Sequence, residues 1–261
     1  MSDLATHVIL LLALAAFVAG FIDSIAGGGG LIAIPALLLA GFTPFEALGT
    51  NKLQGLFGSG SAALHYARQG KVDVRQQLPW AVLGFAASAI GALVATSIPG
   101  DALRIALPVV LVAIALYFAL KPNLDDLDRA QRIGPTAFGL AIVPLIGFYD
   151  GVFGPGTGSF LMLAFVSLAG YGLLKATAHT KFLNFATNLG GFAAFAAVGV
   201  VSWKIGLIMG VAQFAGARLG AALALKNGAR LIKPLLVIVC VAMALRLLAD
   251  PTHPVRALLG V

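Results

Sequence analysis

Long apolar runs alternate with short polar loops along most of the chain. Five runs are nearly free of charged residues and are mostly 15 to 21 residues long: Leu4–Phe21, Leu78–Ile98, Leu103–Leu120, Ile205–Leu225 and Pro234–Leu248. A helix of about 20 apolar residues spans the hydrocarbon core of a bilayer. The pattern therefore predicts an all-α, polytopic membrane protein embedded in a lipid bilayer.

Two glycine-rich segments interrupt this pattern. Gly27–Gly30 and Gly154–Gly158 each separate a predicted helix of about 15 to 17 residues from one of about 12. Each segment predicts a break, because glycine costs a helix interior about 1 kcal/mol relative to alanine. The shorter helix would measure about 18 Å, less than the ~30 Å of the hydrocarbon core. We expect each broken pair to form either a re-entrant hairpin or two abbreviated spans.

The breaks belong to an internal repeat. Phe21–Ser24 matches Phe148–Gly151, and Thr50–Lys52 matches His179–Lys181, with an offset that drifts only from 127 to 129 residues. This predicts a first repeat at 1–124, a cytoplasmic linker at 125–132 and a second repeat at 133–261. Each repeat is expected to hold a short broken helix pair with a Gly-rich tip, followed by three membrane-spanning helices.

Lysine and arginine counts give the repeats opposite orientations. Arg68–Arg75 carries three cations and its counterpart Gly199–Lys204 carries one, whereas Ile98–Arg104 carries one and its counterpart Lys226–Lys233 carries three. Because these cations concentrate in cytoplasmic loops, equivalent loops are predicted to face opposite sides of the membrane. Inverted-topology repeats are characteristic of secondary transporters. The alternative is an old duplication that was kept only for packing.

Charge and motifs narrow the function classes further. The net charge of +7 lies mainly in short loops between apolar runs, which the positive-inside rule explains without a nucleic-acid partner. The four histidines are scattered, and the chain has neither an HExxH nor a GxSxG motif. We therefore expect no enzyme, no metal site and no cofactor.

The helix that follows each break is predicted to direct its N-terminus toward the middle of the membrane. Its first N–H groups lack intrahelical partners and its dipole is positive there, which favours an anion. Glycine also lets the backbone approach a ligand closely. The alternative is that glycine merely permits close helix packing. The predicted substrate-binding residues of the two breaks are Gly27, Gly28, Gly29, Gly30, Gly154, Gly156, Thr157 and Gly158.

Two lysines are predicted to lie at matched depths in the next helix of each repeat. Thr43–Glu46 has the sequence of an N-cap with a proline in the first turn and a capping-box glutamate. Lys52 is eight residues into that helix, roughly 12 Å deep, and Lys181 lies about nine residues beyond Gly172. A lysine at such depth is usually functional or paired. We expect both lysines to offset the charge of a bound anion.

Amides and acids surround these lysines. Several polar residues lie on or near the same turns and can bind anion oxygens or satisfy unwound backbone: Asn51, Gln54, His179, Thr180, Asn184 and Asn188. Asn51 and Asn184 are the predicted donors, since Asn184 is one turn from Lys181 and faces the same way. Asp23 and Asp150 precede the breaks. They either carry a coupling proton or pair structurally with a lysine or unwound backbone, and we favour the structural role.

These paired motifs resemble those of the TauE/SafE family of sulfite and organosulfonate exporters. The resemblance lies in Gly20–Gly30, Pro35 and Gly49–Lys52, and in Gly147–Phe160 and His179–Lys181, and it covers nearly the whole chain. It implies a permease of the bacterial inner membrane that moves sulfite or sulfonates, generally outward. The family's central pathway, as the resemblance implies, maps to Gly27–Gly30, Lys52, Gly154–Gly158 and Lys181.

The sequence therefore predicts a secondary transporter of small sulfur-containing anions. The anion would be held between the two glycine-rich helix N-termini and Lys52 and Lys181, and exported by alternating access. An anion channel is one alternative. A transporter of another small anion, or of a cation bound by Asp23 and Asp150, is another.

Overall fold

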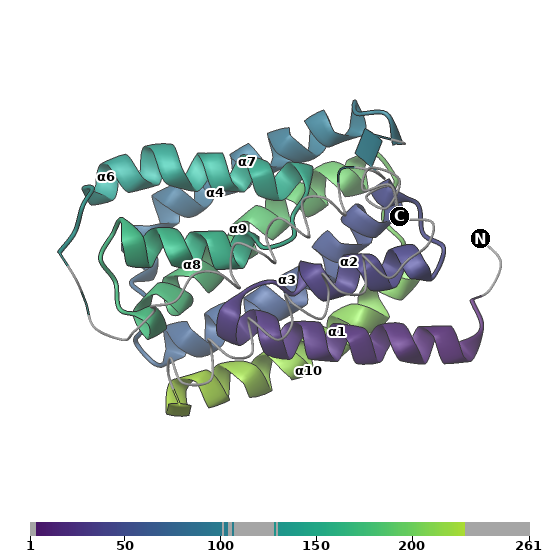
Figure 1. The fold of residues 1–261 in the computed structure, drawn as a ribbon, viewed down its shortest axis with the longest axis horizontal. Helices are drawn as coiled ribbons and strands as arrows, with labels where there is room; N and C mark the ends of the chain where they lie inside the picture. The colour runs from purple at the N-terminus through teal and green to yellow at the C-terminus, as the bar shows by residue number, and fades with distance from the viewer. Residues whose placement is uncertain (1–3, 101, 104–105, 107–127, 129, 228–261) are drawn as a thin grey trace, which may run out of the picture.

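The computed structural model describes residues 4–100, 102–103, 106, 128 and 130–227 (Figure 1). These residues form helices and connecting loops, with no strand among them, in agreement with the predicted all-α class. The predicted spans Leu103–Leu120 and Pro234–Leu248 lie outside the described residues, apart from Leu103 and Ala106, as does half of the predicted linker.

The helices form two sets in the same order. The first set is α1 (Thr6–Ala26), α2 (Gly30–Leu39), α3 (Pro44–Arg68) and α4 (Val74–Thr96). The second is α6 (Pro135–Ala137), the π-helix η1 (Phe138–Ile142), α7 (Val143–Val152), α8 (Thr157–Ser167), α9 (Leu173–Ala197) and α10 (Trp203–Asn227). In each set a long helix, a short helix and two long helices follow one another.

The first helix of each broken pair is longer than predicted. α1 has 21 residues and the continuous helical stretch Pro135–Val152 has 18, so the predicted 15 to 17 residues were wrong. α1 continues past Asp23, whose carboxylate accepts a hydrogen bond from the N–H of Gly29 beyond the helix end. In the second set Pro144 has no N–H for an i−4 bond, and the helix passes this point through η1, where Val143 N–H bonds to the Phe138 carbonyl.

Within the described residues, four helices are long and apolar enough to cross a membrane: α1, α4, Pro135–Val152 and α10. α2 and α8 have 10 and 11 residues, close to the predicted 12. α3 and α9 are not among the four, although each has 25 residues and is therefore about 37 Å long. Most of the buried polar side chains lie on these two helices.

The long helices pack across the two sets. α10 packs against α1 and α3, whereas α4 packs against α7 and α9, and α3 contacts α9 between them. In Figure 1, α1 begins at the right and runs to the left, whereas the stretch from α6 to α7 begins at the left and runs to the right. Each set therefore covers helices of the other.

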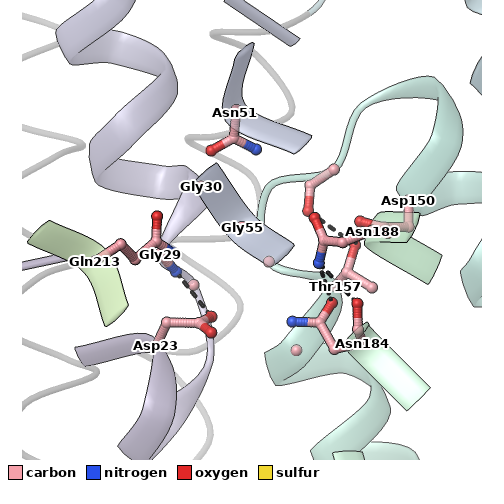
Figure 2. A pocket seen from close by; sticks show the side chains of 14 residues that line it. Asp23, Gly29, Gly30, Asn51, Gly55, Asp150, Thr157, Asn184, Asn188 and Gln213 are labelled. Atoms are coloured by element: carbon pink, nitrogen blue, oxygen red, sulfur yellow. Dashed lines mark hydrogen bonds between the residues drawn. The ribbon is translucent and has the colours of Figure 1, made fainter. Parts of the chain in front are cut away.

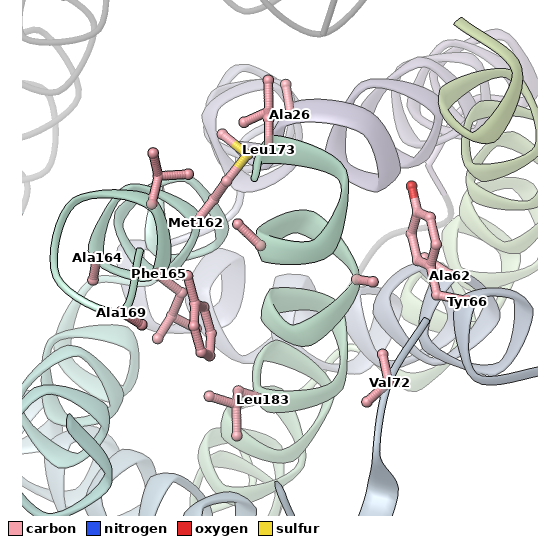
Figure 3. Packing of buried hydrophobic residues seen from close by; sticks show 14 of the residues in the cluster. Ala26, Ala62, Tyr66, Val72, Met162, Ala164, Phe165, Ala169, Leu173 and Leu183 are labelled. Carbon is pink, nitrogen blue, oxygen red and sulfur yellow. The ribbon is translucent and has the colours of Figure 1, made fainter. Parts of the chain in front are cut away.

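Two apolar clusters lie at opposite ends of α3 and α9. One joins the C-terminal parts of α1 and α3 to α8 and the first turns of α9; Figure 3 shows Met162, Phe165 and Leu173 within it. The other joins α2 and the first turns of α3 to the end of α9, around Leu37 and Phe195. The buried polar residues of α3 and α9 are at mid-length, between the two clusters.

Asp128 ties the segment before α6 to the start of α9. Its Oδ1 accepts the N–H of Gly172, the N-cap of α9, at 2.5 Å, and its Oδ2 lies 3.4 Å from Lys175 Nζ. Lys175 Nζ also sits 4.1 Å from the centre of the Tyr171 ring. The Gly172 N–H, and then the Lys175 charge, hold the pKa of Asp128 below its usual range.

Candidate functional site

The two glycine breaks contact each other in the interior. Gly27 and Gly154 have φ of 80° and 86°, left-handed values that glycine adopts without strain and that reverse the chain between helices. A Cβ added to Gly27 would fall 2.4 Å from the Ser159 nitrogen, so the two backbones are in contact. Ser159 Oγ also donates to the Ala26 carbonyl at 3.0 Å.

A small polar pocket of about 30 Å³ lies where the breaks meet (Figure 2). This is space for about two water molecules. Eleven of the fourteen predicted site residues line it: Asp23, Gly28, Gly29, Gly30, Asn51, Asp150, Gly154, Gly156, Thr157, Gly158 and Asn184. The other three, Gly27, Lys52 and Lys181, do not line it. The wall also includes Gly55, Asn188 and Gln213.

Both lysines pair with aspartates of the other helix set. Lys52 Nζ of α3 lies 2.8 Å from Asp150 Oδ1 of α7, and Lys181 Nζ of α9 lies 3.0 Å from Asp23 Oδ2 of α1. The four side chains are 0 to 9% exposed. The pairing considered for the lysines is thus present, and each lysine stands behind a carboxylate that lines the pocket. A direct role of the lysines in substrate binding stays a prediction.

The two carboxylates are not equally satisfied. Asp23 Oδ1 accepts the Gly29 N–H at 3.1 Å, and its Oδ2 accepts from Lys181. Asp150 Oδ1 accepts the Thr157 hydroxyl at 2.7 Å and forms the ion pair with Lys52 Nζ. Asp150 Oδ2 has no hydrogen-bond partner among the described residues. Each aspartate thus joins the end of one helix to the start of the next, but only Asp150 keeps an oxygen free.

Side-chain amides form much of the remaining wall. Asn188 Nδ2 donates to the Asn184 carbonyl at 2.7 Å, and Gln54 Nε2 donates to Asn51 Oδ1 at 3.0 Å. In Figure 2, Asn188 and Asp150 lie on one side of the pocket, and Gln213 lies on the other side with Asp23. The amide groups can therefore donate to oxygens of a ligand from both sides.

Gln213 was not predicted as a site residue. It is 3% exposed, and its Oε1 has no hydrogen-bond partner within the described part of the chain. The available signal was an amide within the apolar run Ile205–Leu225, where a polar side chain is costly and usually functional. Gln213 reaches the pocket because α10 packs against α1 and α3.

Two tyrosines hold the breaks in place. The Tyr66 hydroxyl of α3 donates to the Ser24 carbonyl at 3.0 Å, before the first break. The Tyr149 hydroxyl of α7 donates to the Pro155 carbonyl at 2.6 Å, inside the second break. No group of three or more His, Cys, Asp or Glu residues that could hold a metal occurs in the described ranges. The site is therefore built from helix ends, amides and two neutralised acids.

Comparisons with known proteins identify relatives across the whole length. Residues 12–247 match the family described as Sulfite exporter TauE/SafE. "Probable membrane transporter protein ORF9" of Sinorhizobium sp is 63% identical over 260 residues, which cover 100% of both chains. "Probable membrane transporter protein YfcA" of Escherichia coli (strain K12) is 48% identical over 235 residues, covering 90% of this chain and 87% of the relative. No solved structure matches the chain.

A third relative is also named as a membrane transporter. The "Probable membrane transporter protein" of Haemophilus influenzae is 45% identical over 251 residues, covering 95% of this chain and 97% of that protein. The family match includes both glycine breaks, both lysines, most of α1, and all of α4, Pro135–Val152 and α10. The chain therefore belongs to the TauE/SafE family and is a multi-pass membrane transporter.

Proposed function

We propose that the protein is a secondary transporter of small sulfur-containing anions, sulfite or organosulfonates, which it exports across the bacterial inner membrane. The observation that carries this proposal is the meeting of two helix N-termini, those of α2 and α8, at one buried polar pocket. Unpaired N–H groups and helix dipoles favour negative charge there. The family's description, Sulfite exporter TauE/SafE, supports the choice of sulfur oxyanions.

The charges around the pocket favour an anion over a cation. Asp23 and Asp150 line the wall, but each is already paired with a buried lysine. The four charges sum to zero, so the pocket offers a cation no uncompensated negative charge. The positive ends of α2 and α8 would also repel a cation. The lysines therefore offset the carboxylates, and the helix ends supply the attraction for the anion.

The arrangement of the two helix sets supports alternating access. α1 and the stretch from α6 to α7 run in opposite directions in Figure 1, which supports inverted repeats. The pocket has space for about two water molecules, whereas sulfite has four non-hydrogen atoms and methanesulfonate five, so the breaks must separate for a substrate to enter. One repeat then rocks against the other, and the site opens to one side of the membrane at a time.

The proposed contacts to the anion come from both breaks. The N-terminal backbone of α2 and α8, at Gly28–Gly30 and Thr157–Gly158, approaches the oxyanion, and Asn51 and Asn184 donate from α3 and α9. Gly27, Gly154 and Gly156 shape the breaks so that this backbone lies close to the ligand. Lys52 and Lys181 lie behind the carboxylates that line the pocket, and they reach the anion when a pair opens.

Transport by purified protein in liposomes tests the proposal. Proteoliposomes loaded with sulfite or methanesulfonate should release the anion faster than protein-free liposomes. Unlabelled substrate on the other side should accelerate exchange of labelled substrate. A leak without this acceleration would indicate a channel, and uptake of a metal cation with indifference to both anions would overturn the proposal.

Paired variants test the residues. The double variant Lys52→Ala, Lys181→Ala should lose most transport, whereas Lys71→Ala should keep it, because Lys71 is an exposed loop residue. Wild-type transport by the double variant would contradict the lysine assignment while leaving anion transport itself intact.

A further inference from the structure

One oxygen of the site lacks a partner although it is deeply buried. Asp150 is 2% exposed and lines the pocket, and its Oδ2 has no hydrogen-bond partner among the described residues. Asp23 is the equivalent residue of the other set, and both of its oxygens are occupied, by Gly29 N–H and Lys181. The two acids thus occupy matched places in the wall, but of the two only Asp150 keeps an oxygen without a hydrogen-bond partner.

The charge balance gives this oxygen a function. Lys52, Lys181, Asp23 and Asp150 together carry no net charge. A bound monoanion would leave one uncompensated negative charge deep in the protein, and it would face the Asp150 carboxylate directly. Uncompensated charge in such surroundings is costly. A proton on Asp150 neutralises its carboxylate, so the site and the bound monoanion together carry no net charge. The same proton turns an acceptor that repels the anion into an O–H donor.

We propose that Asp150 Oδ2 takes up one proton with each monoanion that binds, so that the protein is an anion–proton symporter. This inference rests on the proposed anion transport and names its coupling ion and coupling residue. The proton comes from water on the side to which the site is open, forms an O–H bond at Oδ2, and leaves with the anion on the other side. Lys52 stays an ammonium throughout.

The charged and titratable groups around Asp150 agree with this assignment. Lys52 approaches from α3, Tyr149 precedes Asp150 on α7, and the Asp23–Lys181 pair contributes from α1 and α9. α8, which begins at Thr157, carries no charged residue. Lys52 is the cation nearest to Asp150, and protonation frees its charge to act on the anion.

A proton fits this place better than a metal ion does. A metal ion needs several oxygen ligands, and the other unpartnered acceptor of the wall, Gln213 Oε1, belongs to a side chain on the opposite side of the pocket (Figure 2). Asp150 lies beside Thr157 and Asn188. The Thr157 hydroxyl already donates to Asp150 Oδ1, and the Asn188 amide already donates to the Asn184 carbonyl.

In a symporter, the combined gradients of the anion and of protons set the direction of transport. Export proceeds when the outward concentration ratio of the anion exceeds the inward ratio of protons, and uptake proceeds in the opposite case. For a monoanion the cycle carries no net charge, so the membrane potential does not drive it. Sulfonates and hydrogen sulfite are therefore the expected substrates, because a dianion would leave one charge uncompensated.

Proton counting on binding tests the inference. Methanesulfonate is a suitable probe because it stays a monoanion at every pH used, so any proton that is taken up enters the protein. Its binding to the purified protein is measured by calorimetry in two buffers of different ionisation enthalpy. Wild type and the exposed-loop control Lys71→Ala should take up about one proton per anion, and Asp150→Asn, whose amide imitates the protonated acid, should bind with no uptake.

Wild-type liposomes provide a second measurement that needs no variant. A pH dye is trapped inside, the membrane potential is clamped, and an inward methanesulfonate gradient is applied. Coupled acidification of the interior, close to one proton per anion, supports the inference. Anion entry without acidification would overturn the coupling at Asp150 but leave anion transport standing. Acidification that requires sodium ions, or the absence of any anion movement, would overturn it as well, and the latter would also refute the proposed function.

Discussion

The Lys181 ammonium lies 3.0 Å from the Asp23 carboxylate, although 158 residues separate them along the chain. Lys52 and Asp150 form the reciprocal pair, so each helix set supplies one lysine and one aspartate to the other. The pairs therefore link the two sets and at the same time remove net charge from the pocket.

Breaking one pair should be more harmful than removing it. Lys181→Met leaves Asp23 as a buried unpaired charge, at a cost of about 3–5 kcal/mol, which would lower Tm by roughly 10 °C. The double variant Lys181→Met, Asp23→Asn should recover most of that loss. Thermal unfolding in detergent measures both, with the exposed Lys71→Met as the matched control. A double variant no more stable than the single one would show that the pair does not carry this energy.

A methyl group at Gly158 should impair transport more than stability. Its Cβ would lie 3.1 Å from Gly27 Cα and 3.3 Å from Lys181 Nζ, tighter than ordinary contacts. Alanine is the better helix former by about 1 kcal/mol, so loss of helix propensity cannot explain a defect. We expect the initial transport rate to fall roughly tenfold, equivalent to about 1.4 kcal/mol.

The matched control for that variant is Gly134→Ala. A Cβ there meets nothing within 4 Å, and Gly134 precedes α6, outside the pocket wall. Equal rates for Gly158→Ala and Gly134→Ala would mean that contact between the breaks is irrelevant to transport.

Gln213→Leu should weaken anion binding. The variant keeps much of the side-chain volume but removes an amide from the pocket wall. One lost hydrogen bond is worth about 1 kcal/mol, so KM should rise about fivefold with a smaller change in kcat. Concentration dependence of transport separates the two constants, and the exposed Gln76→Leu serves as the control. An unchanged KM would remove Gln213 from the site.

Asp128 should stabilise the protein only while its carboxylate is ionised. Hydrogen bonding to Gly172 and the Lys175 charge lower its pKa in the folded state. The contribution is therefore complete above the unfolded pKa and is lost as pH falls through the lower, folded pKa. Because the pair is largely exposed, Asp128→Asn should reduce Tm at pH 7 by no more than about 2 °C. The difference should vanish in strong acid, and a difference that persisted there would point to another cause.

Features that depend on residues close together in the sequence could be predicted from the sequence. Thr43 and Glu46 form the predicted capping box, so Lys52 lies at the predicted position in α3. The glycine breaks also lie where predicted, since consecutive glycines destabilise a helix wherever they occur. Eleven of fourteen predicted site residues line the pocket for the same reason, because the repeat places equivalent turns at equivalent depths.

Features that depend on contacts between helix sets could not be predicted in this way. Periodicity gives the face on which a lysine lies but not which aspartate it meets. The difference between the acids was also hidden: Asp23 bonds to a backbone N–H six residues on, whereas Asp150 bonds to a hydroxyl seven residues on. Gln213 was missed because its place depends on packing of α10 against the first set.

α4 packs against helices of the second set and α10 packs against helices of the first. This arrangement has a consequence for biosynthesis. α1 leaves the ribosome first, yet the helix that covers it, α10, is made after every other described helix. Asp23 and Lys52 likewise have no ion-pair partner until Lys181 and Asp150 have been translated, which happens much later. The N-terminal portion therefore cannot mature as the chain emerges, and a fragment that stops before α6 should be a substrate for membrane quality control.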